Sequence, residues 1–385
     1  MLCADAQERS TQDPTPKHAA TRPPRVLFVA PFAYGLNPGG MQRQVEATAF
    51  HLEKLDLAAV VRANSWQCSF DDIDICHIFT TSPEVLPYAI AARQRGVPIF
   101  VSPIYYPSGA LSTAALKARV LVRLPGCYSN LLAARSLLQL ASRVLPLTSK
   151  EARALQVVFG TPRARMTEIP NGVDPRFANA AEGPFVAAFG HRPDILFVGR
   201  LDRNKNVLGL VRAIEATDLS LTIIGFGARD EPEVEAEVRS RTNQRIRYIG
   251  SIPWESPLLP SAYAAAKVLC LPSFKEVMPL TILEALAAGC RIVTTRNSAM
   301  TDLLGDAVHY CDPGNVQSIR TTVIGAIHSE EPRRLREEVL TSHTWPSVVM
   351  SLSNLYRNEL VRAESIPTSS HPVDMSPSTC GVIRG

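Results

Sequence analysis

Two glutamates that could act at one site, Glu276 and Glu284, stand in the segment from residue 272 to 289. The pattern there predicts a strand that ends at Pro272, a loop that carries Glu276, and a helix that begins near Pro279 or Leu280. The first N–H groups of a helix have no partner within it, so such a helix start favours a phosphate or another anion. A solvated pair of surface glutamates is the alternative, although apolar residues flank both carboxylates.

Two basic side chains, Arg200 and Lys205, lie five residues apart in a loop that follows Gly199. A guanidinium offers a fork for phosphate oxygens and an ammonium adds a point charge, so the two could bind one anion together. A solvated basic loop is the alternative. Gly39 and Gly40 follow the first predicted strand. A glycine pair there permits close approach of a phosphate or sugar, although most such pairs only form turns.

These residues lie in loops or helix starts that follow predicted strands. Short apolar runs alternate with helical segments and lack the alternation of half-exposed strands, which is typical of parallel sheets covered on both faces. This alternation of strands and helices begins again near residue 190. We therefore expect an α/β chain of two Rossmann-like, doubly wound parallel-sheet domains facing a central cleft, with ligands beyond the carboxyl ends of the strands. Strands are expected at residues 25–30, 73–78, 97–102, 143–147, 194–199, 219–224, 245–248, 268–271 and 291–294, and helices at 42–54, 207–216, 261–266, 281–288 and 345–362.

The composition is that of a folded protein without a strongly charged partner. Hydrophobic residues make up 46% of the chain and charged residues 20%, which excludes wholesale disorder. The net charge of +4 is too small for a nucleic-acid-binding face. The first 24 residues lack the apolar core of a signal peptide, and no apolar run reaches the roughly 18 residues of a spanning helix. We therefore expect a cytoplasmic protein whose eight scattered cysteines are reduced thiols.

The segment from Glu276 to Glu284 resembles the Glu-x7-Glu motif of retaining glycosyltransferases of the GT-B fold, family 4, also called glycosyl transferases group 1. The loop with Arg200 and Lys205 resembles that family's Gly-Arg-Leu…Lys-Gly pattern. The resemblance implies that Glu276 lies against the donor sugar and that Glu284 binds the ribose hydroxyls of the nucleotide. It also implies that the two basic residues bind the donor diphosphate.

Carried over to this chain, the resemblance gives Glu276, Arg200 and Lys205 as catalytic residues. No Asp-x-Asp metal motif stands in a suitable loop. We therefore expect no cofactor and no metal ion, with the two cations doing the work of a divalent ion on a UDP- or GDP-linked donor. Gly225 and Gly227 resemble the family's glycine turn near the nucleotide base. The expected donor-binding residues are Gly39, Gly40, Gly199, Arg200, Lys205, Gly225, Gly227, Glu276, Val277, Met278, Pro279, Leu280 and Glu284.

The chain departs from the family pattern at three places. Val277 stands where the family often has glycine, which bears on the fit of the donor sugar, and Asn206 replaces the usual glycine after Lys205. The histidine that many members carry after the fourth strand is absent from residues 102–106, so a tyrosine hydroxyl or the backbone would have to contact the sugar. His77 lies on an earlier strand, where a buried structural role is the better interpretation.

The resemblance also assigns the expected parts of the chain. Asn171-Gly172 matches a family signature, and we expect it to shape the connection between the domains. We expect disordered tails at residues 1–24 and 364–385, an acceptor-side domain at 25–185, a nucleotide-sugar domain at 186–344, and a helix at 345–363 that packs back on the first domain.

The expected activity is transfer of a sugar from a nucleotide diphosphate-sugar to a hydroxyl of a lipid-linked or saccharide acceptor. Residues 305–313 resemble members that build bacterial surface polysaccharides, so polysaccharide or glycolipid synthesis is expected, with mannosyl transfer as one option. A nucleotide-sugar epimerase and a non-catalytic nucleotide-sugar-binding protein are the alternatives. Basic residues among apolar ones in segment 116–143 could contact the inner face of the plasma membrane, or form an ordinary surface helix.

Overall fold

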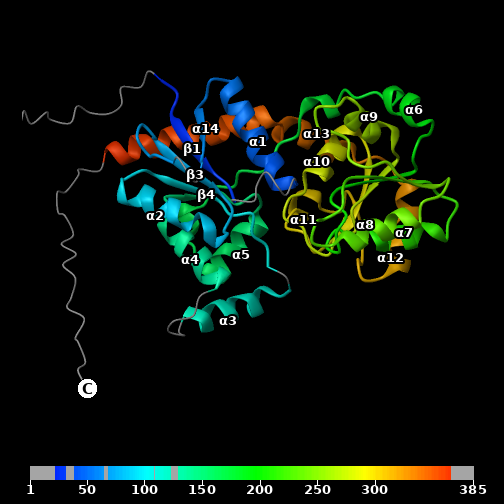
Figure 1. Cartoon of the computed structure of the whole chain (residues 1–385), viewed down its shortest axis with the longest axis horizontal. Helices are drawn as coiled ribbons and strands as arrows, with labels where there is room; N and C mark the ends of the chain where they lie inside the picture. Colours follow the sequence, from blue (N-terminus) through cyan, green and yellow to red (C-terminus); the bar gives the residue numbers. More distant parts are fainter. Residues whose placement is uncertain (1–21, 32–38, 65–67, 108, 123–128, 366–385) are drawn as a thin grey trace, which may run out of the picture.

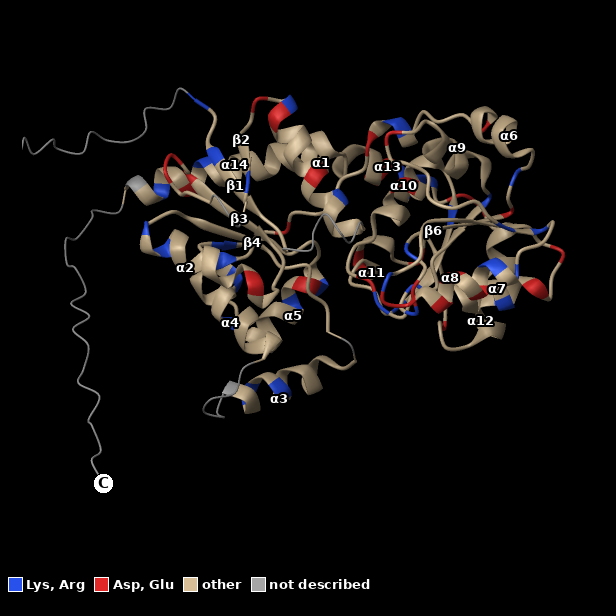
Figure 2. Ribbon diagram, viewed as in Figure 1, with Lys and Arg blue, Asp and Glu red and all other residues tan. Residues whose placement is uncertain are grey.

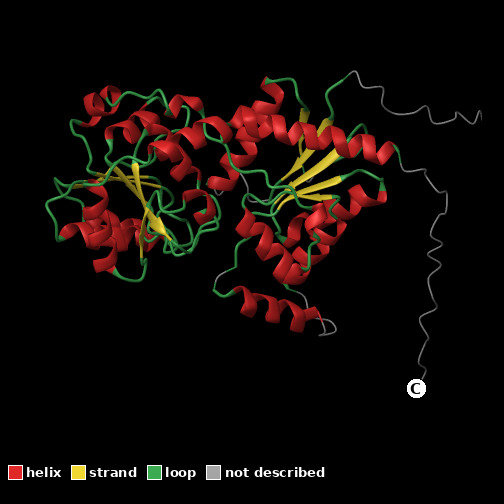
Figure 3. Cartoon of the chain, turned by 180° about the vertical axis from the view of Figure 1, so that it is seen from behind, coloured by secondary structure: helices red, strands yellow, loops and turns green. Residues whose placement is uncertain are grey.

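The computed structural model describes residues 22–31, 39–64, 68–107, 109–122 and 129–365. It contains two parallel sheets, each covered by helices on both faces, which lie side by side along the longest axis of the molecule (Figure 1). The predicted doubly wound architecture is therefore confirmed. The same two layered units are seen from behind in Figure 3, with the strands enclosed between the helices.

The first sheet has the strand order β2-β1-β3-β4-β5, and all of its pairs are parallel. Neighbouring residues of β1 point to opposite faces: Val26 joins the core under α1 and the late helix α14 (Trp345–Glu364), whereas Leu27 joins the core under α2, α4 and α5. The elements are β1 (Arg25–Val29), α1 (Gly40–Lys54), β2 (Ala59–Arg62), β3 (Ile75–Phe79), α2 (Leu86–Gln94), β4 (Ile99–Ser102), α3 (Leu111–Val122), α4 (Asn130–Leu140), β5 (Arg143–Val144) and α5 (Ser149–Phe159).

The second sheet has the order β11-β10-β9-β6-β7-β8 and is again parallel throughout. Its inner strands β6, β7, β9 and β10 are buried on both faces in one continuous hydrophobic core. The elements are α6 (Gly183–Phe189), β6 (Ile195–Val198), α7 (Val207–Glu215), β7 (Leu221–Ile224), α8 (Pro232–Ser240), β8 (Ile246–Tyr248), α9 (Leu258–Ala265), β9 (Val268–Cys270), α10 (Leu280–Ala288), β10 (Arg291–Thr295), α11 (Thr301–Leu304), β11 (His309–Cys311), α12 (Val316–Ile327) and α13 (Arg333–Ser342).

Two chain segments cross between the sheets, and they pair with each other. Val173 donates its N–H to the carbonyl of His343 at 2.7 Å and accepts the N–H of Trp345 at 3.2 Å. Helix α14 (Trp345–Glu364) then returns to the first sheet and packs beside α1 (Figure 1). The predicted tails lie largely outside the described residues, which begin at Arg22 and end at residue 365.

One expected strand was too long, and two edge strands were not expected. Strand β5 ends at Val144 instead of residue 147, because the Leu147 N–H donates to the Glu151 carboxylate at 2.7 Å and not to β4. The edge strands β2 and β11 were not predicted, since each carries only a short, partly exposed apolar run. Short 3-10 turns at Pro83–Val85, Arg163–Arg165 and Pro175–Phe177 complete the described elements.

Candidate active site

A cavity of about 680 Å³ lies between the carboxyl ends of the two sheets. We call the first sheet with its covering helices the first unit, and the second sheet with its helices the second unit. The first unit contributes the start of α1 and the loops after β4 and β5. The second unit contributes the loops after β6, β7, β8 and β9 together with the start of α10. Sequence reasoning had expected these loops to converge. The predicted residues that line it are Gly39, Gly40, Gly199, Arg200, Lys205, Gly225, Glu276, Val277, Met278, Pro279, Leu280 and Glu284.

An ion pair between Lys205 and Glu276 lies in the wall of this cavity. Lys205 Nζ donates to Glu276 Oε1 at 2.6 Å, and only 22% and 9% of the two side chains are exposed. The Glu276 backbone is fixed by the loop after β10, because its N–H donates to the Asn297 carbonyl and its carbonyl accepts from Ala299. The carboxylate therefore has a defined position beside a cation, at the end of β9.

The predicted phosphate ligand Arg200 is held by a residue that sequence reasoning missed. Asp202 is almost fully buried, accepts from Arg200 Nε at 2.6 Å, and also accepts the Lys205 backbone N–H at 2.7 Å. The Arg200 side chain remains 46% exposed at the cavity. One carboxylate thus orients both basic residues, and its place between them in sequence was the available signal.

The loop after β6 is tied to the loop after β9 by two asparagines. The backbone carbonyl of Asn204 accepts the Phe274 N–H at 2.8 Å, and its side-chain Nδ2 donates to the Lys275 carbonyl at 3.0 Å. Asn206 adopts a left-handed backbone conformation with φ 56°, which asparagine tolerates better than most residues. This conformation explains why asparagine can stand there in place of glycine.

Gly225 permits the close approach of the loops after β6 and β7. Its φ is +153°, and a Cβ at this position would lie 1.8 Å from the carbonyl oxygen of Gly199. Gly227, by contrast, does not line the cavity, and its N–H donates to Glu235 at 3.0 Å. The structure therefore brings only the first glycine of this predicted pair to the site.

Glu284 points from α10 into the buried end of the cavity. Its Oε2 accepts from the Tyr263 hydroxyl at 2.7 Å, and its Oε1 lies 3.6 Å from a guanidinium nitrogen of Arg43. Burial raises the pKa of Glu284, while the positive charge of Arg43 and the Tyr263 hydrogen bond act in the opposite direction. Pro279 precedes α10, and no side chain caps that helix start. The first N–H groups of α10, which follow Glu276 in the chain, therefore donate to no capping side chain.

Arg43 crosses from the first unit to the second. Its guanidinium lies 4.1 Å from the ring centre of Trp254, and Arg176 lies 3.9 Å from the same ring. The indole therefore contacts two cations, and a cation over an aromatic face is favourable. Sequence reasoning missed Arg43 and Trp254, because they meet only when the two units pack together.

The connection between the units also contributes to the site. Asn171 donates from Nδ2 to the Met278 carbonyl at 2.8 Å and lines the cavity. Within the described residues, neither the side-chain oxygen Oδ1 of Asn171 nor the hydroxyl of Thr281 has a hydrogen-bond partner. The predicted role of Asn171 in the connection agrees with this contact. The unpaired oxygens add polar groups that a ligand could use.

His77 has the buried position that the sequence suggested. Its ring nitrogens lie 2.6 Å from the Tyr356 hydroxyl and 2.9 Å from Ser102 Oγ, and burial lowers its pKa to about 3. In the segment expected to replace the missing histidine, Ile104 lines the cavity, whereas the Tyr105 ring packs on Phe159.

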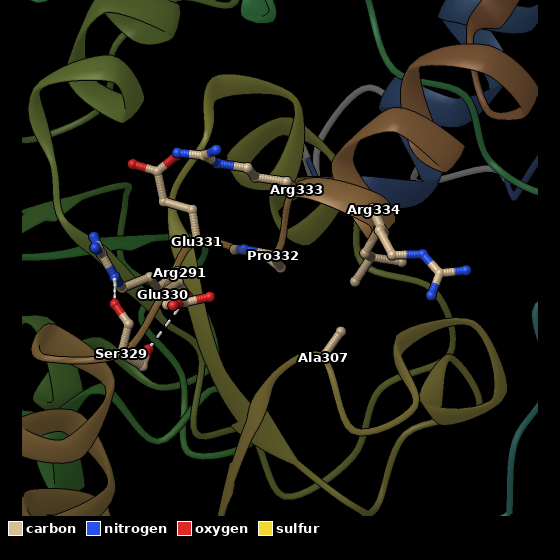
Figure 4. Close-up of a pocket in the computed structure, with 9 residues that line it drawn as sticks. Arg291, Ala307, Ser329, Glu330, Glu331, Pro332, Arg333 and Arg334 are labelled. Atoms are coloured by element: carbon tan, nitrogen blue, oxygen red, sulfur yellow. Dashed lines mark hydrogen bonds between the residues drawn. The ribbon is translucent and has the colours of Figure 1, made fainter.

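A second cavity of about 620 Å³ lies at the opposite end of the second sheet, before β10 and β11 (Figure 4). Arg291 donates from Nε to the Ser329 carbonyl there. Arg333 and Arg334 are exposed, and Figure 4 shows Arg334 directed away from Arg291. Since ligands of open parallel sheets bind at the carboxyl ends, this cavity does not belong to the site described above.

Two facing parallel α/β units with a polar cavity between their carboxyl ends define the GT-B class of glycosyltransferase folds. Residues 192–329 match the family described as glycosyl transferases group 1, and residues 15–172 match the glycosyl transferase 4-like domain. The chain belongs to the group 1, family 4, glycosyltransferases.

Solved structures with little sequence identity share this fold. The chain superimposes on sucrose-phosphate synthase from Thermosynechococcus elongatus with a TM-score of 0.70 and 16% identity, covering 89% of this chain and all of that one. It superimposes on Anabaena HepE in complex with UDP-glucose with a TM-score of 0.61 and 15% identity, covering 88% of this chain and 98% of that one.

Curated relatives match in shorter regions. The O-antigen chain mannosyltransferase B of Escherichia coli is 29% identical over 147 residues, which are 36% of this chain and 38% of that protein. The D-inositol 3-phosphate glycosyltransferase of Kribbella flavida is 30% identical over 198 residues, which are 47% and 46% of the two chains. The matched region is thus less than half the length of either relative.

Proposed function

We propose that this protein transfers a sugar from a nucleotide diphosphate-sugar to an acceptor hydroxyl with retention of configuration, in the synthesis of a bacterial surface polysaccharide or glycolipid. The observation that carries the proposal is the convergence of the Glu276–Lys205 pair, Arg200 and the uncapped start of α10 on one cavity. A carboxylate, two cations and helix N–H groups are the chemistry that a sugar diphosphate requires. Anabaena HepE, with the same fold, was crystallised with UDP-glucose.

The reaction breaks the bond between the sugar C1 and a diphosphate oxygen and forms a bond from C1 to the acceptor oxygen. Negative charge develops on the departing nucleoside diphosphate, where Arg200, Lys205 and the first N–H groups of α10 would stabilise it. The acceptor proton passes to an oxygen of the leaving phosphate. Glu276 would lie against the sugar, and Glu284 would accept hydrogen bonds from the ribose hydroxyls.

The residues of the cavity also support a reaction without a metal ion. Two fixed cations beside one loop can neutralise a diphosphate in place of a divalent ion, and Asp202 holds both of them in position. Activity is therefore expected to persist in EDTA. Abolition of transfer by the chelator, with recovery on adding magnesium, would contradict this part of the proposal.

The acceptor is proposed to approach from the first unit, beside a membrane surface. Helix α3 exposes Leu116 and Val120, by 62% and 49%, together with the basic side chains Lys117 and Arg119. Basic positions along α3 are blue in the ribbon of Figure 2. Such a face suits anionic lipid. Arg143, which had been counted in the same basic segment, is instead paired with Glu359 at 2.8 Å and does not belong to this surface. No helix in the described ranges is both long and apolar enough to cross a membrane.

The donor is identified by a thermal-shift screen against UDP-, GDP- and ADP-sugars, since a ligand that binds only the folded state raises its apparent stability. Transfer is then measured with the donor that binds and with prenyl-linked and free saccharide acceptors. We expect one nucleotide class to stabilise the protein and to yield a glycosylated acceptor. Conversion of the donor to an isomer without acceptor would instead indicate an epimerase.

A further inference from the structure

A carboxylate that none of the steps above uses lies completely buried next to the cavity. Glu151, in the first turn of α5, has no exposed surface. Its Oε1 accepts the Tyr105 N–H at 2.6 Å, and its Oε2 accepts the Leu147 N–H at 2.7 Å. Tyr105 follows β4 and Leu147 follows β5, so one side chain joins the carboxyl ends of two neighbouring strands.

The burial of this carboxylate is unfavourable in itself. In the described part of the chain no basic side chain pairs with Glu151, and burial raises its pKa to about 7 despite the two backbone hydrogen bonds. Taking a carboxyl group out of water without a cation costs free energy. An arrangement of this kind points to a constraint other than stability.

The loops that Glu151 joins form part of the first-unit wall of the cavity, beside the start of α1. Ile104, directly before Tyr105, lines the cavity and has φ 51°, a left-handed conformation that is strained for a β-branched residue. Leu147 lines the same cavity. Strained backbone at a ligand site persists only when its surroundings hold it in place. The hydrogen bond from Tyr105 to Glu151 acts on the peptide next to the strained residue.

The same turn of α5 also contacts the second unit. Ser149 Oγ donates to Asp302 at 2.5 Å, and Lys150 Nζ lies 3.4 Å from the same carboxylate, so α5 and α11 meet across the cleft (Figure 1). The turn that carries Glu151 therefore also carries a contact between the two units.

We propose that Glu151 is a positioning residue of the active site, which fixes Ile104 and Leu147 at the side of the cavity where the acceptor enters. This role rests on the transferase function proposed above. Glu151 acts through the backbone it holds. It therefore affects productive placement of the acceptor more than binding of the nucleotide, which the second unit contacts.

The test compares Glu151→Gln and Glu151→Ala with the wild type, and with Val158→Ala as a control. Val158 is buried on the same helix but does not line the cavity, so its truncation destabilises α5 without releasing the two loops. For each protein the thermal midpoint, the affinity for the nucleoside diphosphate, and kcat and KM for the acceptor are measured. Gln retains one carbonyl oxygen and can hold one of the two N–H groups.

We expect kcat/KM for the acceptor to fall about 10-fold in Glu151→Gln and about 100-fold in Glu151→Ala, as small misplacements in a site typically do. Nucleotide affinity should stay within about twofold, and Val158→Ala should lower the thermal midpoint but not kcat/KM. If Val158→Ala lowers kcat/KM as much as Glu151→Gln, or if Glu151→Gln transfers like the wild type, the positioning role is wrong. If the wild type neither binds a nucleotide-sugar nor transfers, the proposed function fails and this role with it.

Discussion

Replacing Gly172 by alanine tests how the two units are joined. A Cβ at this position would lie 2.6 Å from Trp345 Cδ2 and 2.7 Å from both Cα and N of Trp345. Two of these three atoms are backbone, so no rotation of a side chain can relieve the overlap. The crossing segments must move apart, and the hydrogen bonds between Val173 and residues 343 and 345 must lengthen.

The expected loss of stability follows from these contacts. Two backbone hydrogen bonds contribute about 1 kcal/mol each, and overpacking adds about 1–3 kcal/mol. Alanine also lowers the conformational entropy of the unfolded chain, which offsets about 0.4–1 kcal/mol of this loss of stability. The net expectation is a decrease of about 2–5 kcal/mol in the free energy of unfolding. Donor affinity should fall as well, because the neighbouring Asn171 holds the Met278 carbonyl at the cavity.

Urea unfolding, followed by circular dichroism, measures the effect. Gly183→Ala is the matched control, because Gly183 begins α6 and nothing lies within 4 Å of its added Cβ. This control should be neutral or slightly more stable than the wild type. A Gly172→Ala protein that unfolds at the same urea concentration as Gly183→Ala would refute the close packing of the two crossings.

Three other expectations concern charge and surface. Lys205→Ala leaves Glu276 buried without its partner and should lower kcat about 100-fold or more, whereas Lys205→Arg should keep part of the activity in the same transfer assay. His77 has a folded-state pKa of about 3 against 6.5 in the unfolded chain, so its neutral ring stabilises the fold. Its contribution to the free energy of unfolding is complete above pH 6.5 and is lost as the pH falls toward 3. The loss is on the order of 5 kcal/mol, and urea midpoints measured against pH should show it in the wild type but not in His77→Gln. Leu116→Ser with Val120→Ser should reduce sedimentation with anionic vesicles without lowering the thermal midpoint, because both side chains are exposed; equal sedimentation would rule out the α3 surface.

The sequence was sufficient to predict the inner strands of both sheets. Strands such as Ile195–Val198 are buried on both faces, so their apolar runs are unbroken and easily recognised. The edge strands β2 and β11 escaped, because an edge strand buries less and carries a weaker apolar signal. Strand β5 was predicted too long, since two of the apolar residues after it, Leu145 and Leu147, belong to the loop that lines the core and the cavity.

The site was predictable where it depends on local order along the chain. Glu276 and Lys205 follow neighbouring strands, and the order of the sheet brings their loops together. Arg43 and Trp254 were not predictable, because their contact requires the relative placement of the two units. The role of Glu151 was also hidden, since a glutamate in the first turn of a helix ordinarily caps it at the surface.

The central claim is that the cavity between the sheets binds and activates a nucleotide diphosphate-sugar. Its most direct test is the release of nucleoside diphosphate from UDP-, GDP- and ADP-sugars in EDTA, by the wild type and by Glu276→Ala. We predict that the wild type releases the diphosphate from one nucleotide class, slowly with water and faster with an acceptor, and that Glu276→Ala is at least about 100-fold slower. An equal rate in both proteins, or isomerisation of the donor without release of diphosphate, would contradict the account.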